Sequence, residues 1–216
     1  MSLLPDEPEL ELIHTRQYEA RVYKIDDTTM LARAAVSDVK PPDLYIAGDE
    51  QPLEIHRMHL FMHVTLPGLE IIDAGVELET FPHTGCPAIA VHYQKLVGLN
   101  IARGFNRKVR ELFGGPRGCA HTTSLLLAMA PAVLQAIWSM SLRDSATPTP
   151  DDSASAHQAR LQGNVNTCHV WDENGAHVEL VRSGGPVETM IPVAVRLREL
   201  GRSDDEWRQR FMPYDD

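Results

Sequence analysis

The sequence predicts an α+β fold in which an antiparallel β-sheet, or a partly closed barrel, packs on a central apolar helix. Three observations support this prediction. Apolar and polar residues alternate within residues 17–80, the spacing of apolar residues becomes helical over 92–142, and residues 121–142 are apolar on nearly every side. A period of two is typical of half-buried strands and a period near 3.6 of helices. A sheet should therefore come first, followed by the helices that pack on it.

The strands are indicated by three alternating segments, at residues 30–36, 58–64 and 72–78. Asp38 continues the inward parity of the first segment. Between the second and third, a two-residue loop would place Met62 opposite Asp73, whereas the three-residue loop Pro67-Gly68-Leu69 places Met62 opposite Ala74. The apolar match predicts the three-residue loop, because a one-residue slip would turn every side chain to the wrong face.

Two histidines of the middle segment belong to its outward parity. In the predicted register His59 opposes Glu77 and His63 opposes Asp73. Four residues along a strand span roughly 13 Å, which is too far for one metal ion. We interpret these residues as a solvated face with cross-strand pairs of histidine and acid.

Three helices are expected in the next region, at Tyr93–Leu99, Gly104–Phe113 and His121–Leu142, the last kinked at Pro131. The segment Gly114–Gly118 is a glycine-rich loop between the second and the third. Because the third helix is apolar nearly all round, it is predicted to be the central buried helix.

The second half of the chain contains a low-complexity stretch at residues 143–163, predicted to be a mobile loop. A hairpin is predicted after it, from Val165–Trp171 and Ala176–Arg182, with Asn174-Gly175 as a type I′ turn. From Val187 on we expect two helices, the second beginning at a capping box, Ser203–Glu206, and ending near Met212-Pro213.

The expected domain organisation follows from these segments. Residues 1–13 form a loose lead-in, residues 14–185 a single α+β domain that includes the mobile loop, and residues 186–216 a helical tail that packs on it.

The composition restricts the partners. The formal net charge is −10, which argues against nucleic acid and against an anionic membrane surface, since both are bound by an excess of Lys and Arg. The start of the chain lacks the features of a signal peptide, and the apolar run Leu125–Trp138 is short for a bilayer. We expect a cytoplasmic protein with a small-molecule substrate, and a homo-oligomer is compatible with the sequence.

Asp38 and His56 are candidate catalytic residues. Both lie on the inward parity of their strands, at strand ends where site residues often gather. An inward acid beside an inward histidine is suited to acid–base chemistry. The alternative is that both side chains have emerged into solvent at the ends of their strands.

The segment after the glycine-rich loop offers a second set of candidates. Cys119 and His121 come at the start of a helix, where free N–H groups and the helix dipole favour anions and thiolates. We predict His121 to be catalytic, and Arg117, Gly118 and Cys119 to hold an anionic group of the substrate. The alternative is a tight glycine turn with a buried cysteine.

His169 and Trp171 are candidates because of the predicted hairpin. Its turn pairs His169 with Leu180 and Trp171 with Val178, so both residues should face the core and Cys168 should face away. His169 is predicted to be catalytic and Trp171 to contact the substrate. A core histidine whose hydrogen bonds are satisfied is the alternative.

The three cysteines suggest a metal as an alternative to catalysis without a cofactor. Cys86, Cys119 and Cys168 would bind zinc or iron together with neighbouring histidines. The spacings include no C-x-x-C pair, and three cysteines in a cytoplasmic protein favour free thiols over disulfides.

Several motifs together resemble the bacterial domain-of-unknown-function family 2889. They are the strand end Asp38-Val39-Lys40, the segments Ile55–Met58, Cys86-Pro87 and Leu96–Phe105, and the blocks Gly114–His121 and Asn166–His169. The resemblance covers about residues 14–185 and implies a recurrent site at Asp38, His56, Cys119, His121, Cys168 and His169. The chain departs from the family pattern at Arg57 and His59, where an acid and an aromatic are usual, which suggests an altered substrate.

Three functions fit these observations. The leading hypothesis is a lyase or isomerase of bacterial catabolism that acts on a small aromatic compound by acid–base chemistry, without a nucleotide cofactor; motifs for nucleotide binding are lacking. The alternatives are a zinc or iron protein and a non-enzymatic accessory module.

Overall fold

The computed structural model describes residues 3–144, 164–183, 185 and 188–208. Tertiary contacts divide the chain into two compact units, Met1–Trp138 and Ser139–Asp216. The sequence predicted that residues 139–185 belong to the same domain as the sheet. The packing of residues 186–216 on that domain stays a prediction. Most of the low-complexity stretch, residues 145–163, and the expected end of the last helix lie outside the described residues.

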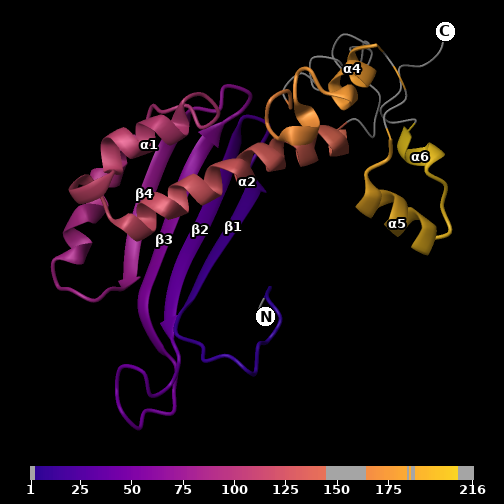
Figure 1. The fold of residues 1–216 in the computed structure, drawn as a ribbon. Coiled ribbons are helices and arrows are strands. Elements are labelled where there is room, and N and C mark those ends of the chain that lie inside the picture. Colours follow the sequence, from indigo (N-terminus) through magenta and orange to yellow (C-terminus); the bar gives the residue numbers. More distant parts are fainter. Residues whose placement is uncertain (1–2, 145–163, 184, 186–187, 209–216) are drawn as a thin grey trace. The chain divides into compact units, whose positions relative to one another are not determined.

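The first unit contains an open antiparallel sheet of four strands in the order β1-β2-β3-β4 (Figure 1). The strands are β1 (Thr15–Lys24), β2 (Thr29–Lys40), β3 (Leu53–Thr65) and β4 (Ile71–Thr80). The predicted α+β class is confirmed, and the sheet is open rather than a partly closed barrel.

The predicted register of the last hairpin is confirmed, since Met62 pairs with Ala74 and His63 with Asp73. The turn itself differs from the expected three-residue loop. Thr65 N donates to Glu70 O over 2.9 Å, so four residues lie between this closing pair. A register shift between His63 and Val64 absorbs the additional residue and keeps the apolar side chains on the inner face.

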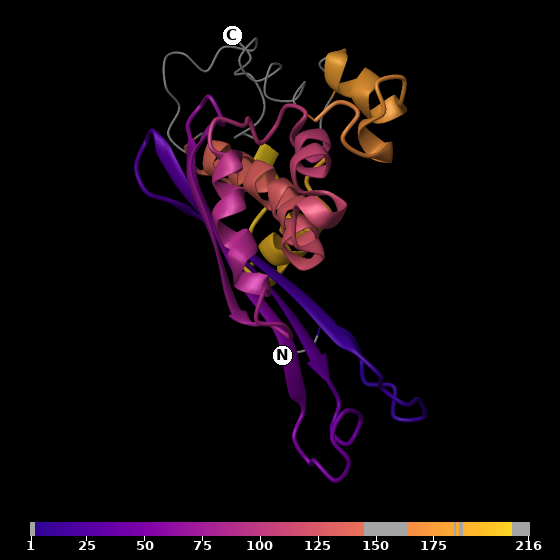
Figure 2. The same ribbon diagram turned by 90° about the vertical axis from the view of Figure 1, so that its left-hand side faces the viewer.

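One face of the sheet is covered by η1 (Cys86–Leu96), α1 (Phe105–Phe113) and α2 (Ala120–Asp144), as Figure 2 shows from the side. The short 3-10 helix η2 (Gly115–Arg117) joins α1 to α2. The expected first helix lies earlier in the chain than predicted. It ends at Leu96 because Gly98 N donates to Ile71 O and Ile71 N donates to Leu99 O, which ties the following residues to β4.

Helix α2 is the predicted apolar helix, but it buries one stripe of its surface in the core rather than most of it. The stripe is formed by Leu125, Leu126, Met129, Ala130 and Val133, whereas Leu134 is 37% exposed. Residues Ala120–Met140 have the length and the mean hydropathy, 1.5, of a membrane-spanning segment, and 28% of that window is buried in the protein. The apolar run is thus longer than predicted, but a core helix of a soluble protein meets the same criteria.

The second unit contains η3 (His169–Trp171), α4 (Ala176–Arg182), α5 (Ile191–Glu199) and α6 (Asp205–Arg208). The predicted hairpin at residues 165–182 is therefore wrong. Gly175 is not part of a type I′ turn but precedes α4 in an extended conformation. Val178 and Val181 are the buried residues of α4, and a spacing of three marks one face of a helix.

Candidate functional site

The candidate site begins with a row of three residues across the inner face of the sheet. Arg16 of β1 pairs with Asp38 of β2, and Asp38 pairs with His56 of β3. A register shift between β2 and β3 follows directly, at Asp38 and Val39. The alternation of β2 places Asp38 on the same side as the buried Val36, so the carboxyl group points toward the covering helices.

Asp38 is 2% exposed. Its carboxylate is contacted by one side chain of β1 and by one of the segment before β1. Arg16 Nε donates to Oδ1 and Arg16 Nη2 donates to Oδ2, both over 2.6 Å. His14 Nε2 lies 3.4 Å from Oδ1. Two charge-assisted hydrogen bonds from one guanidinium are strong and directional, so Asp38 is held in one orientation.

Two imidazoles share the remaining side of this carboxylate. His56 Nδ1 lies 3.0 Å from Asp38 Oδ2, and His121 Nε2 from the first turn of α2 lies 3.0 Å from the same oxygen. The two rings are stacked, with centroids 3.8 Å apart and planes inclined by 30°. An ionised carboxylate only accepts hydrogen bonds, so the facing nitrogens carry the hydrogens. His56 Nε2 and His121 Nδ1 are then the atoms left for proton transfer.

The charges within this cluster set its protonation. Burial favours the neutral form of Asp38, but the hydrogen bond and charge of Arg16, with the nearby imidazoles, outweigh it and lower the Asp38 pKa to about 2. The pKa of His121 is lowered from its ordinary value of 6.5, first by burial and then by the charges of His56 and Arg16. The site therefore combines an ionised acid with a neutral imidazole at neutral pH.

Cys119 adjoins the imidazoles at the start of α2. Its Sγ lies 3.7 Å from His121 Nδ1, so His121 stands between a thiol and a carboxylate. The buried Tyr93 of η1 fixes the backbone here, because Cys119 N donates to Tyr93 Oη over 2.9 Å and Tyr93 Oη donates to Cys119 O over 3.4 Å. The start of α2 is thereby attached to the packed core.

Comparison with known families supplies an assignment at this point. Residues 14–135 match the model of a protein family of unknown function, DUF2889. The chain belongs to the DUF2889 family. The matched region contains the whole sheet and the first turns of α2, hence every residue of the cluster around Asp38. Neither the curated proteins nor the solved structures gave a match.

In this DUF2889 protein the glycine-rich loop before Cys119 packs against the end of α1. Arg117 Nε donates to Glu111 O over 2.9 Å and Nη2 to Arg110 O over 3.3 Å, so its guanidinium binds the end of α1. A Cβ on Gly118 would lie 2.4 Å from Phe113 O, which means that this close backbone approach requires glycine. The substrate contacts proposed for Arg117 and Gly118 stay predictions.

The remaining predicted site residues belong to η1 and to the segment around η3 in the DUF2889 chain. His169 and Cys168 are exposed in and beside η3, so the expectation that His169 faces the core is wrong. Trp171 is half-buried, with its ring edge-on to His177 at 4.7 Å. Cys86 is half-buried at the start of η1. The errors at η3 follow from the hairpin, because its parity assigned the wrong face.

Among the described residues, one group of three side chains has the spacing of metal ligands, namely Asp38, His56 and His121. Their nearest ligand atoms all lie within 4.8 Å of one another. None of the three cysteines belongs to this group, and the zinc or iron ligands predicted at the cysteines stay a prediction.

Sequence reasoning missed Arg16, His14 and Tyr93. The signal for Arg16 was present in the turn between β1 and β2, where Thr28 N donates to Asp26 Oδ1 over 2.7 Å. An Asx turn at this point would have given the register of the hairpin and hence the partner of Asp38. For Tyr93 no local pattern distinguished a site residue from a core aromatic.

Proposed function

We propose that this DUF2889 protein is an enzyme that moves a proton on a small organic substrate, with His56 and His121 as acid and base. One observation supports the proposal most directly. A single buried oxygen, Asp38 Oδ2, lies 3.0 Å from a nitrogen of each imidazole. A carboxylate in this position fixes the tautomer and orientation of each ring, as catalytic acids and bases require.

The stacking of the two rings limits them to one added proton at neutral pH. Two imidazolium ions with centroids 3.8 Å apart would repel, while one charged and one neutral ring share the field of Asp38. The lowered pKa of His121 favours it as the base, which leaves the role of the acid to His56. A pair of neighbouring groups in opposite protonation states is suited to proton transfer in both directions.

The start of α2 indicates the substrate class. Free N–H groups in the first turn of a helix attract anionic oxygens, and His121 lies in that turn. A carboxylate, phenolate or enolate would therefore bind beside the base. The net charge of −10 makes a polyanionic partner such as nucleic acid unfavourable, which supports a small substrate.

Within this class we favour a lyase or isomerase on an aromatic compound in the cytoplasm. In a retro-aldol cleavage, the base removes the proton of a β-hydroxyl group and the C–C bond breaks. One product leaves as a carbonyl compound, and the electron pair of the broken C–C bond forms the enolate of the other product. The acid then protonates the enolate carbon, so the step consumes no redox cofactor.

The test begins with binding of aromatic carboxylic acids and phenols, detected by thermal shift, and continues with a panel of aromatic β-hydroxy carbonyl compounds. Products are followed by liquid chromatography and mass spectrometry. In His56→Ala and in His121→Ala we expect turnover to fall by about 100-fold or more, in the range of general acid–base catalysis.

His59→Ala is the matched control, because His59 lies on the same strand, contacts Glu79 over 2.6 Å, and faces the opposite side of the sheet. Its activity should equal that of the natural protein. Full turnover in the His56→Ala, His121→Ala double variant would refute the proposal.

A second candidate is a divalent metal ion held by Asp38, His56 and His121. Two histidines and one carboxylate bind zinc or iron(II) and leave open positions for a substrate. Against it, Arg16 occupies both oxygens of Asp38 and adds a positive charge beside the position of the cation. For this reason we place acid–base chemistry first.

Elemental analysis by mass spectrometry separates the two candidates. Stoichiometric zinc or iron in the natural protein, lost in Asp38→Asn and in His56→Ala but kept in His59→Ala, would establish the metal site. Metal retained after these changes would place any bound ion elsewhere.

A further inference from the structure

Cys119 carries a thiol that the proposed proton transfer does not use. It directly precedes α2, and its carbonyl oxygen accepts the first hydrogen bond of that helix, from Thr123 N over 2.9 Å. Cys119 is thus the N-cap residue of α2. Cys119 and His121 are both half-buried and the intervening Ala120 is exposed, so a small molecule can reach the thiol and the imidazole from solvent.

The tautomer of His121 places a base beside this thiol. His121 Nε2 lies 3.0 Å from Asp38 Oδ2, and an ionised carboxylate only accepts hydrogen bonds, so Nε2 carries the ring hydrogen. His121 Nδ1 therefore offers a lone pair, and Cys119 Sγ lies 3.7 Å from it. The S–H group donates to this nitrogen. Thiol, imidazole and carboxylate thus follow one another as nucleophile, base and orienting group.

The other two cysteines have a different environment. Cys86 is half-buried at the start of η1, and Cys168 is exposed beside η3. Within the described part of the chain, the contact between Cys119 and His121 is the only one that joins a thiol to an imidazole. One chain therefore contains an exposed thiol without a base and a less exposed thiol with a base, which allows the two influences on reactivity to be separated.

We propose that Cys119 is the nucleophile of an acyl-transfer reaction, with His121 as its base and a carboxylic ester as the substrate class. A cysteine beside an oriented histidine performs this chemistry in unrelated folds. The inference goes beyond the proton transfer proposed above and does not depend on it, because an ester needs no acidic C–H or O–H group to react in this way.

The first turn of α2 supplies donors for the charge that develops on the substrate. Cys119 N is engaged by Tyr93 Oη over 2.9 Å. The N–H groups of Ala120 and His121 come next, and among the described residues they have no hydrogen-bond partner. Free N–H groups at a helix start stabilise negative charge, such as that on the oxygen of a carbonyl group under attack.

The reaction balances with water as the second reactant. His121 Nδ1 takes the thiol proton while sulfur bonds to the carbonyl carbon, and the π electrons of the carbonyl group move to its oxygen. As this electron pair returns, the bond from carbon to the ester oxygen breaks, and the imidazolium protonates the departing alkoxide. Water then attacks the thioester and gives a proton to His121. The C–S bond breaks, the carboxylic acid leaves, and the thiolate recovers the proton.

The reactivity of the three thiols in the natural protein tests the activation of Cys119 without any substitution. The folded full chain is treated with less than one equivalent of iodoacetamide, and the labelled cysteines are identified by peptide mass spectrometry. Cys119 should be labelled first, although Cys168 is the more exposed residue. Preferential labelling of Cys168 would mean that exposure alone governs reactivity, and it would overturn the proposal.

Acyl transfer is tested with p-nitrophenyl acetate as the probe, and the release of p-nitrophenol is followed by absorbance. The natural protein should release it above the rate of the buffer, and Cys119→Ser, which changes one atom, should abolish this release. In His121→Ala the rate should fall by about 100-fold or more. An inactive natural protein would overturn the proposal. Release at the natural rate in Cys119→Ser would overturn it as well, since water activated by an imidazole or a metal ion needs no thiol.

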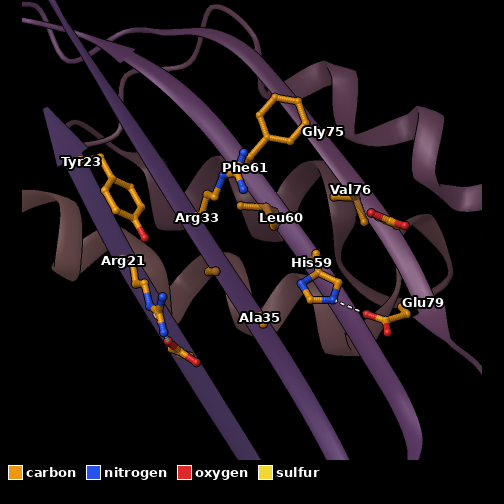
Figure 3. Close-up of a pocket in the computed structure, with 13 residues that line it drawn as sticks. Arg21, Tyr23, Arg33, Ala35, His59, Leu60, Phe61, Gly75, Val76 and Glu79 are labelled. Atoms are coloured by element: carbon orange, nitrogen blue, oxygen red, sulfur yellow. Dashed lines mark hydrogen bonds and ion pairs between the residues drawn. The ribbon is translucent and has the colours of Figure 1, made fainter. Parts of the chain in front are cut away.

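The matched control for His121→Ala is His59→Ala. His59 also contacts a carboxylate, Glu79, over 2.6 Å, but it lies on the outer face of the sheet, which η1, α1 and α2 do not cover (Figure 3). There it lines a groove of about 630 Å³ to which no cysteine belongs. His59→Ala should release p-nitrophenol at the natural rate. An equal loss in both variants would assign the effect to the fold and refute the role of His121 as the base.

Discussion

Arg16 and Asp38 form a bidentate ion pair on the inner face of the sheet, with both N–O distances at 2.6 Å. The pair joins the edge strand β1 to the strand that carries the acid of the candidate site. It also helps to keep Asp38 ionised although the residue is buried, because the guanidinium and the nearby imidazoles together outweigh the cost of burial. Stability and the proposed chemistry therefore depend on the same contact.

Acid should weaken the protein through Asp38. Its pKa is lowered from 3.8 to about 2 in the folded state. The unfolded chain therefore binds the proton first, and a contribution of about 2 kcal/mol, fully present above pH 3.8, is lost as the pH falls toward 2. Urea unfolding should show that Asp38→Asn destabilises the protein at pH 7 and that the difference shrinks near pH 2. An equal difference at both pH values would contradict the assignment.

His121 should titrate below 6.5 in the folded protein. Its neutral form is favoured by burial, so the related stability is present above pH 6.5 and declines as the pH falls through the lowered pKa. Nuclear magnetic resonance of the imidazole nitrogens gives the midpoint directly. We expect His56→Gln to raise it by removing a neighbouring charge, whereas His59→Gln on the outer face should leave it unchanged. A midpoint above 6.5 would show that Asp38 dominates.

Gly118→Ala should destabilise the protein by about 2 kcal/mol, as overpacking in a core does. The new Cβ would lie 2.4 Å from Phe113 O and 2.9 Å from Phe113 Cβ, and a backbone oxygen cannot turn away as a flexible side chain can. Thermal unfolding measures the loss. Gly85→Ala serves as the control, since a Cβ there meets nothing within 4 Å. Equal melting temperatures for the two variants would disprove the close approach at Gly118.

Gly75→Ala should cost about 1–3 kcal/mol, because the added Cβ would collide with the ring of Phe61. The cost should fall in the Phe61→Leu background, where the ring is absent. A double-mutant cycle measured by urea unfolding gives the coupling between the two positions. Strictly additive effects would mean that the ring does not rest on Gly75.

The sheet was the most predictable part of the fold. Alternation in β2, β3 and β4 fixed the faces of these strands, and apolar matching gave the pairing of Met62 with Ala74 that the structure confirms. Residues 165–182 show the limit of the same reasoning. Val178 and Leu180 suggested a strand, but burial of Val178 with Val181 made the segment helical. In a short segment both periods fit several residues equally well, so tertiary packing decides between them.

The sequence by itself determined that Asp38 and His56 lie on the inward face at the ends of their strands, because the side-chain period of a strand leaves no other choice once the apolar face is known. It also placed Cys119 and His121 at a helix start. Only the tertiary structure decided that His121 meets the same oxygen as His56, and that Arg16 binds it too. The distance between a helix end and a sheet is set by the packing of residues far apart in the sequence, and no local pattern records that distance.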